Sequence, residues 1–180
     1  MKLLLVTAQF FALLVLAAPS VWAADSISVG ASLPMSYSFD AAKDGGKLQS
    51  NGLSGMLLTA TLPIVGTFGV ETYDVGLKDN GDAKLSLLIV DYIFVFPIPF
   101  VNIGVGAGIG TANLKGGTYA TEYSRATASQ WLLQIGIPLI AGVNLDYGYH
   151  SVTARPKYTS KDYYLEASGT MSSLGLSFGF

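Results

Sequence analysis

Two kinds of side chain alternate along most of the sequence, and this period of two constrains the fold more than any other feature. In SISVGASLPMSYSF, residues 26–39, every odd position is apolar or aromatic and every even position is small or polar. Segments within 100–112, 128–138, 142–152 and 163–180 repeat the pattern. A helix brings side chains together every three or four residues, whereas a strand directs alternate side chains to opposite faces. The pattern therefore predicts strands with one apolar face and one small, polar face.

The stretch from Leu88 to Gly110 is so apolar that hydropathy alone would make it a membrane-spanning helix. As one helix, it would place Asp91, two prolines and four glycines in hydrocarbon. As two strands, it keeps Asp91 on the face opposite the large apolar side chains. Proline cannot donate a ladder hydrogen bond, so we expect Pro97 and Pro99 to lie in the turn between the two strands.

The same criterion predicts eight strands, at residues 26–39, 50–62, 67–76, 84–96, 100–112, 128–138, 142–152 and 163–180. The third strand alternates weakly, which is compatible with a bulge. The connections are short and apolar in one direction and long and polar in the other. This order predicts an up-and-down meander in which all short turns lie at one end and all long loops lie at the other.

The N-terminal segment has the form of a secretory signal peptide. Lys2 is followed by an apolar run, Pro19, and small residues that end at Ala23. We therefore expect residues 1–23 to be removed and residues 24–180 to form one domain. A retained membrane anchor is the alternative, and Pro19 and the Val-x-Ala ending favour cleavage.

The distribution of charge indicates which solvent the strands meet. Only 12% of the residues are charged, about half of the roughly 25% found in soluble domains. Most of them lie in or beside the long connections, and only Glu71, Asp91 and Asp146 lie inside predicted strands, on the polar face. Faces of Gly and Ser are too small and uncharged for a solvated exterior. We expect apolar faces to contact lipid, where unpaired backbone groups are too costly and the sheet must close.

The sequence therefore predicts an all-β fold, an eight-stranded antiparallel up-and-down transmembrane β-barrel. Aromatic residues would form girdles at both interfaces, with phenylalanines near the short turns and, near the long loops, Tyr37, Tyr147, Tyr149, Tyr163 and Tyr164. The alternative is a soluble, lipocalin-like barrel with Trp131, Phe178 and Phe180 directed into a cavity. The chain has no cysteine, which excludes disulfides, and a net charge of −2, which does not favour nucleic acid.

These features resemble the small outer-membrane barrels of Gram-negative bacteria, the group of the OmpA transmembrane domain, OmpX and OmpW. In that group an aromatic C-terminus with apolar residues at alternate positions is an assembly signal, matched here by Leu174, Leu176, Phe178 and Phe180. The resemblance implies a monomer in the outer membrane, surrounded by lipid and lipopolysaccharide. It also implies the barrel-assembly machinery as a partner during biogenesis, short turns in the periplasm and long loops outside the cell.

A polar cluster is predicted inside the barrel, comprising Glu71, Asp91, Gln130, Gln134, Asp146 and His150. Pairing through the turns would place Asp146 opposite Gln134, His150 opposite Gln130, and Asp91 near Gly104. No Lys or Arg is predicted in the same interior. The cluster is interpreted either as a hydrogen-bonded polar core or as a cation or proton site.

Large apolar residues also have inward parity, namely Leu53, Leu57, Leu85, Leu87, Ile89 and Leu132. Packed against glycine-rich strands, they would fill the lumen and leave no open aqueous pore. A small apolar cavity, as in the OmpW group, is the alternative.

No catalytic, metal or cofactor site is expected, because His150 and Ser151 point to opposite faces and no metal-ligand cluster occurs. One long loop contains Arg155, Lys157 and Lys161. These residues are interpreted either as part of a solvated loop or as a contact for lipopolysaccharide phosphates or a surface ligand. The leading functional hypothesis is a structural or surface-interaction role through extracellular loops, without catalysis. The alternative is an OmpW-like conduit for small hydrophobic solutes.

Overall fold

The computed structural model describes residues 27–42, 47–63, 65–78, 82–98, 100–117, 122–140, 142–160 and 162–180. The proposed signal peptide, residues 1–23, lies outside these ranges. Eight strands are present: β1 Ser28–Phe39, β2 Ser50–Leu62, β3 Gly66–Leu77, β4 Lys84–Ile98, β5 Val101–Lys115, β6 Ala126–Ile140, β7 Val143–Ala154 and β8 Gly169–Gly179. None of the described segments is a helix long and apolar enough to cross a bilayer.

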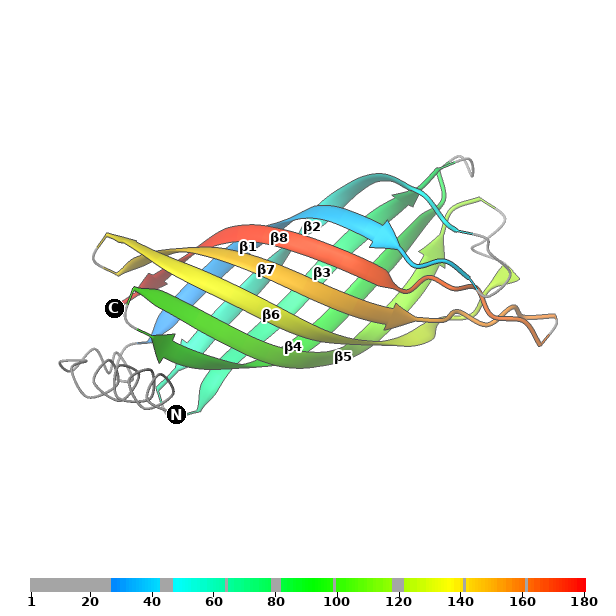
Figure 1. Ribbon diagram of the computed structural model, residues 1–180. Coiled ribbons are helices and arrows are strands. Elements are labelled where there is room, and N and C mark those ends of the chain that lie inside the picture. The colour runs from blue at the N-terminus through cyan, green and yellow to red at the C-terminus, as the bar shows by residue number, and fades with distance from the viewer. Residues whose placement is uncertain are drawn as a thin grey trace, which may run out of the picture.

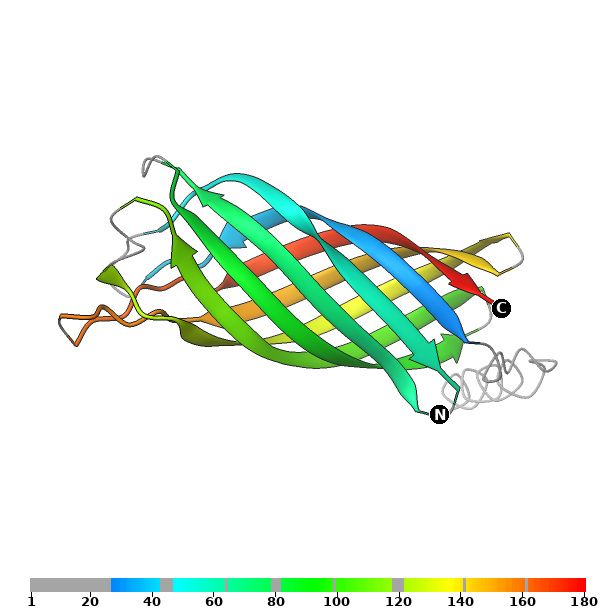
Figure 2. The ribbon, with the colours of Figure 1, turned by 180° about the vertical axis from the view of Figure 1, so that it is seen from behind.

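The strands form one closed antiparallel barrel in sequence order (Figures 1 and 2). β1 and β8 close it, pairing from Ser28 opposite Gly179 to Phe39 opposite Gly169. The short turns lie at the end of the barrel that also holds the C-terminus, here called the turn end. The long connections lie at the opposite, loop end. The eight-stranded up-and-down barrel predicted from the sequence is confirmed.

Three local predictions are wrong. Pro97 lies inside β4, opposite Asn102, and Phe100 takes the left-handed turn position with φ of 74°. β4 pairs with β3 only as far as Ile93, so Pro97 has a neighbouring strand on one side and its missing N–H is tolerated.

The other two wrong predictions concern the position of a bulge and the first residue of a strand, both at the loop end. β3 pairs with β4 without interruption, and the bulge lies instead in β2, between Ser50 and Leu53. β8 begins at Gly169 rather than at residue 163, because the preceding residues pair within the loop: Lys157 bridges Tyr164, and Leu165 N–H donates to Pro156 O.

In the half of the barrel next to the turns, the turn half, apolar side chains point out. Leu33, Val90, Phe94 and Trp131 are about half exposed, at 61%, 53%, 53% and 53%. Inward positions there hold small or polar residues, several of them partly exposed, including Ser28, Gly30, Ser32, Thr59, Thr61, Gln134, Asn144 and Ser177. This matches the predicted sidedness. The soluble alternative is wrong for these strands, because Trp131, Phe178 and Phe180 point outward.

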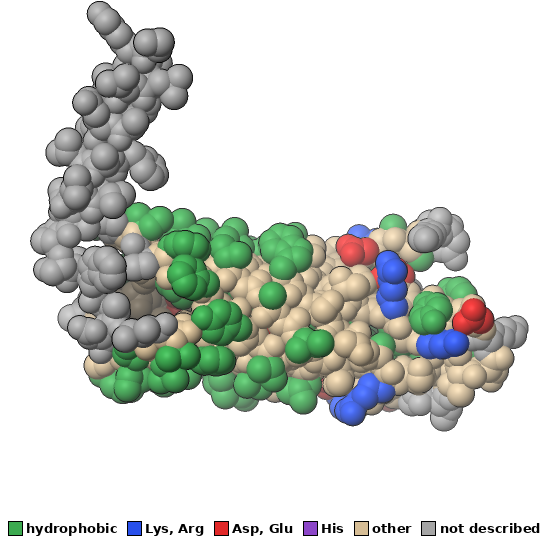
Figure 3. Space-filling model, turned by 90° about the horizontal axis from the view of Figure 1, so that it is seen from below, with side chains coloured by type: hydrophobic (Ala, Val, Ile, Leu, Met, Phe, Trp, Pro, Cys, Tyr) green, Lys and Arg blue, Asp and Glu red, His purple; other side chains and the backbone are tan. Residues whose placement is uncertain are grey.

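In the loop half the sidedness is reversed: the inward direction of Leu85 and Leu87 confirms the prediction, whereas the polar outer wall was not predicted. The interior is a packed apolar core that includes Phe39, Tyr73, Val75, Leu77, Leu85, Leu87, Leu114, Val152 and Met171. The outer wall of the same half carries small polar and charged residues, including Ser36, Ser38, Asp74, Lys84, Ser129, Ser151 and Thr153. Figure 3 shows the large hydrophobic side chains gathered toward the turn end and the charged ones toward the loop end.

A β-bulge in β1 produces the reversal on that strand. Pro34 pairs with Ser173 and Ser36 pairs with Ser172, so Met35 is an extra residue in β1. Beyond it the parity changes: Tyr37 and Phe39 are buried at 6% and 2% exposure, and Ser36 and Ser38 point out. The prediction that Tyr37 belongs to an outer girdle is therefore wrong, and its hydroxyl donates to Ala167 O inside the barrel.

The packed loop half yields a stability prediction. Leu85 is fully buried, so Leu85→Ala should lower the free energy of unfolding by about 2–5 kcal/mol through lost contacts and a residual cavity. Leu88→Ala on the outer face of the same strand is the matched control and should cost much less in detergent. Urea unfolding in micelles measures both, and equal losses for the two variants would contradict the inward packing.

Candidate functional site

The candidate site is a polar network that crosses the lumen where the turn half meets the loop half. Five strands each contribute one side chain: Glu71 from β3, Asp91 from β4, Gln130 from β6, His150 from β7 and Ser173 from β8. All five are buried, with exposures of 2–6%. The apolar core of the loop half lies on one side of the network, and the small polar residues of the turn half lie on the other.

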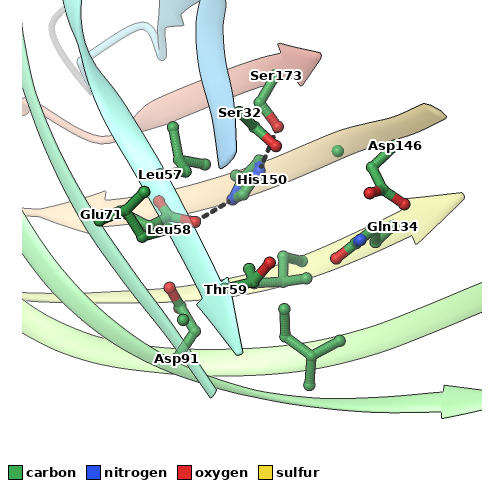
Figure 4. Close-up of a pocket in the computed structure, with 14 residues that line it drawn as sticks. Ser32, Leu57, Leu58, Thr59, Glu71, Asp91, Gln134, Asp146, His150 and Ser173 are labelled. Carbon is green, nitrogen blue, oxygen red and sulfur yellow. Dashed lines mark hydrogen bonds and ion pairs between the residues drawn. The ribbon is translucent and has the colours of Figure 1, made fainter. Parts of the chain in front are cut away.

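His150 links two strands that are not neighbours. Its Nε2 lies 3.1 Å from Ser173 Oγ, and its Nδ1 lies 3.1 Å from Glu71 Oε1. The second contact is an ion-pair distance without the alignment of a full hydrogen bond. Figure 4 shows the three side chains in a line across the lumen. The imidazole therefore joins β8 to β3 through the interior of the barrel.

Asp91 forms the other arm of the network. Gln130 Nε2 donates to Asp91 Oδ1 over 2.6 Å. The carboxyl group of Glu71 is a diagonal neighbour of Asp91, because Glu71 pairs with Ile89 and Asp91 pairs with Gly69. The two carboxylates therefore lie diagonally across adjacent strands.

Two glycines leave the room that these side chains occupy. A Cβ at Gly108, opposite Asp91, would overlap Asp91 Oδ1. A Cβ at Gly148 would overlap Ser173 Oγ and lie 2.7 Å from His150 Nε2. Gly108 on the glycine-rich face of β5 and Gly148 on β7 thus allow polar groups to approach the backbone closely.

The turn side of the network borders a small cavity. It measures about 20 Å³ as the space open to a water centre, and Glu71, Asp91, Gln134, Asp146 and His150 are among its lining residues. A cavity needs roughly 10–15 Å³ on this measure to hold one water molecule. The site therefore has room for one or two waters and for no larger molecule.

The predicted cluster is brought together only in part. Glu71, Asp91, Gln130 and His150 are joined, whereas Gln134 and Asp146 line the cavity outside the network. The predicted pairings are wrong by two residues: Asp146 is opposite Gly136, Gln134 opposite Gly148, and His150 opposite Leu132. Asp91 is opposite Gly108 rather than Gly104. The shift is two residues between β6 and β7 and four between β4 and β5, and an even shift leaves every side chain on its predicted face.

Ser173 is the member that the sequence analysis did not assign to the cluster. It has the inward parity of its strand, so its face was available from the alternation alone. Its position along the barrel axis could not be predicted, because a long loop separates β7 from β8 and gives no information on register. The contact with His150 could only come from the structure.

Ser173, His150 and Glu71 follow the order of a serine-hydrolase triad, with the hydroxyl at Nε2 and the carboxylate near Nδ1. The cavity of about 20 Å³ is far smaller than the roughly 300 Å³ of a small-molecule pocket. The surrounding strand N–H groups bond along the sheet, whereas acyl transfer needs free donors aimed at an oxyanion. The arrangement can hold and exchange protons, but it offers no space for an acyl substrate.

A metal centre is not supported either. Within the described ranges, no group of three or more His, Cys, Asp or Glu residues is placed to hold a metal ion.

The loop basic residues are placed differently from the interior cluster. Arg155 Nε donates to Glu166 Oε2 over 2.9 Å, and Lys157 Nζ lies 3.0 Å from Asp162 Oδ1.

Lys157 also lies over the ring of Tyr164, with Nζ 5.8 Å from its centroid. The hydrogen bond that Lys157 donates to Asp162 raises the pKa of Lys157, which keeps this exposed amine charged. Lys161 lies outside the described residues. The two described basic side chains are thus paired within their own loop.

The predicted assembly-signal residues lie on the outer face of β8 and at the C-terminus. Leu174, Leu176 and Phe178 are 40%, 40% and 48% exposed, and Phe180 is 76% exposed. The placement agrees with the parity that the sequence predicts. The signal itself stays a prediction.

No protein-family model matches the sequence, and no curated protein matches it. Among solved structures, Neisserial surface protein A is 17% identical, with 86% of this chain and 97% of that chain covered and a TM-score of 0.61. Outer membrane protein W of E. coli is 10% identical, with 87% and 98% covered and a TM-score of 0.52. This chain has the fold of the small eight-stranded outer-membrane barrels. At these identities the comparison concerns the fold alone.

The link through His150 can be tested with a double-mutant cycle. His150→Ala leaves a buried carboxylate without its partner and should cost about 1–3 kcal/mol of unfolding free energy. Combined with Glu71→Gln, it should show a coupling of about 0.5–3 kcal/mol, whereas the pair His150→Ala and Asp146→Asn should be additive to within about 0.5 kcal/mol. Urea unfolding in micelles gives all values, and additivity of the first pair would disprove the link.

Proposed function

We propose that the protein is an integral outer-membrane barrel that serves as a closed platform for its extracellular loops, with a structural or surface-interaction role and no catalysis. The observation that carries this proposal is the combination of an apolar belt outside the turn half with a filled interior in the loop half. The belt requires lipid, and the filled interior argues against a channel. The long loops then remain as the parts that can meet a partner.

The belt has the size and composition expected of a membrane-spanning surface. Apolar outward residues on β4 run from Leu88 to Ile98 without a charge, which matches the roughly 9–11 residues that a tilted transmembrane strand needs. Soluble monomers rarely expose contiguous apolar patches above a few hundred Å², and here the apolar surface surrounds the barrel. The barrel closes through β1 and β8, so no strand edge would meet lipid.

The outer wall of the loop half is polar, so we infer that this half projects beyond the hydrocarbon. The boundary falls near Trp131 and Tyr149, whose rings lie 5.7 Å apart on the outer surface. Aromatic side chains favour such interfaces because they join an apolar body to a polar atom. Above the boundary, the barrel continues as a wall with Ser and Thr outside and an apolar core inside, which would hold the loops rigidly away from the bilayer.

The alternative, a conduit for small hydrophobic solutes, is less well supported. Val75, Leu85 and Ile89 have 0% exposure in the lumen, and the cavity of about 20 Å³ lies below them. A contact between the loop basic residues and lipopolysaccharide phosphates would require Arg155 and Lys157 to leave their acidic partners. We therefore place the partner-binding function in the loops without assigning it to these residues.

The membrane orientation predicts where a tryptophan will contact lipid. In a Trp131→Phe background, Phe96→Trp on the belt should be strongly quenched by lipids that carry bromine or nitroxide in their acyl chains. Tyr163→Trp in the long loop is the control and should be quenched weakly. Fluorescence in reconstituted vesicles measures both, and similar quenching of the two tryptophans would reject the proposed orientation.

The closed lumen predicts that the protein does not conduct. Liposomes that contain it should take up sugars and small apolar solutes at the rate of protein-free liposomes, because the loop half is filled by side chains. An open porin reconstituted in parallel shows that the assay detects flux. Uptake above the protein-free rate that disappears when the lumen is altered would favour the conduit instead.

A further inference from the structure

The lumen contains two buried carboxyl groups and no basic partner of fixed charge. Glu71 and Asp91 are 3% and 2% exposed. Among the described residues, each Lys and Arg side chain lies at the loop end or on the outer wall, and His150 is the one inward-facing side chain that can become a cation. Two ionised carboxylates at adjacent buried positions repel each other strongly. The structure therefore requires a positive charge that the fixed cations do not supply.

The oxygen atoms that lack hydrogen-bond partners show where in the network this positive charge would lie. Glu71 Oε2, Asp91 Oδ2 and Gln130 Oε1 are buried oxygens without a hydrogen-bond partner. The other oxygen of each carboxyl is occupied, Glu71 Oε1 by the contact with His150 Nδ1 and Asp91 Oδ1 by Gln130 Nε2. Glu71 and Asp91 lie on the inward faces of neighbouring strands, as a diagonal pair in the register. Figure 4 shows them turned toward the same part of the lumen from neighbouring strands.

We propose that Glu71 and Asp91 share one proton, and that the network is a proton-binding site inside the barrel. The proton lies between Glu71 Oε2 and Asp91 Oδ2, the two oxygens that lack partners. It lowers the charge of the pair from two negative charges to one. The imidazole of His150, 3.1 Å from Glu71 Oε1, lies beside the remaining negative charge.

Each atom then has a consistent role. With His150 neutral and protonated at Nδ1, the ring N–H lies 3.1 Å from Glu71 Oε1 and Nε2 accepts from the hydroxyl of Ser173. When His150 is charged, Nε2–H donates to Ser173 Oγ instead, which a hydroxyl can accept. Gln130 donates to Asp91 in both states. No backbone movement is needed to pass from one state to the other.

A proton fits the site better than a metal ion. A sodium or calcium ion binds several oxygen ligands at once, and the described residues contain no group of three or more acidic, His or Cys side chains arranged for one. A shared proton needs only two oxygens. It also satisfies both unpartnered carboxyl oxygens in one step.

Other titratable groups near the pair come from three strands, β1, β3 and β7, and lack positive charge. Tyr73 lies next to Glu71 on the inner face of β3, and Tyr37 from β1 packs against it with ring centroids 6.3 Å apart. Asp146 of β7 lines the same cavity. The described residues packed against the pair from β2, β5, β6 and β8 are Leu57, Gly108, Gln130 and Ser173, which do not titrate. The pair is therefore governed mainly by itself and by His150.

Water can reach the site from one end. Inward residues between the network and the turns are small, polar and partly exposed, including Ser32, Thr59 and Gln134. On the other side the apolar core leaves Val75, Leu85 and Ile89 at 0% exposure. Protons should therefore exchange with the solution at the turn end and not with the solution at the loops.

The first experiment detects the protonated carboxyl group directly. Infrared spectra of the full chain in detergent at neutral pH should contain a protonated-carboxyl band that is lost in both Asp91→Asn and Glu71→Gln. Asp146→Asn is the matched control, an inward carboxyl outside the network, and should keep the band. Absence of the band from the wild-type protein would overturn the proposal, and this measurement does not depend on the folding of any variant.

The second experiment follows stability as the pH rises. In the wild-type protein, the folded pair keeps a proton that unfolded carboxyl groups release near about pH 4, so the urea midpoint in micelles should fall as the pH rises above about 5 and level off only where the pair itself is deprotonated. Asp91→Asn replaces the acid by a neutral amide that can still accept from Gln130, and its midpoint should stay constant over the same range. Parallel falls in the two proteins would contradict the proposal. Recovery of the wild-type midpoint by sodium or calcium chloride would also overturn it, in favour of a metal ion.

Discussion

Closure of the sheet is the constraint on which the rest of the structure depends. With β1 hydrogen-bonded to β8, each strand has a neighbour on both sides and the backbone polar groups are paired along the sheet. Side chains are then left with only two environments, inside and outside. The two halves of the barrel place residue types differently in these environments. Apolar side chains lie outside in the turn half and inside in the loop half, and the polar network lies at the level where this placement changes.

The network lies at this level for a physical reason. On the loop side of the network the interior is apolar and would leave an ionised group without solvation. On the turn side the small polar lining admits water. Glu71, Asp91 and His150 thus occupy the last position where buried polar groups can remain connected to solvent. The same position explains why the cavity opens toward Ser32 and Gln134 and not toward Leu85. Loop rigidity, lumen closure and proton exchange are consequences of one boundary.

Much of this architecture is predictable from period-two alternation in the sequence, which by itself places Asp91, Asp146 and His150 inside the barrel and Trp131 outside. Register was not predictable, because a slip of two residues leaves every side chain on the same face. The turn and a bulge together set this register: Ile140 pairs with Val143 and Leu139 is an extra residue in β6, so Asp146 meets Gly136 rather than Gln134. Tyr37 was misplaced because the bulge at Met35 leaves the alternation of residue types unchanged while it reverses their direction. The contact of His150 with Glu71 crosses the lumen, and no pattern along one strand records it.

The pairing of the first strand with the last has a consequence for how the chain acquires its structure. The apolar core of the loop half draws on residues from Tyr37 to Met171, so it cannot exclude water until the final strand has arrived. Contacts this distant in sequence are closed slowly, because the loop entropy is lost before the contacts form. A nascent chain that lacks its last strand would present both an open edge and an unfilled interior. Completion of the barrel is therefore a single late event, and the C-terminal strand sets its timing.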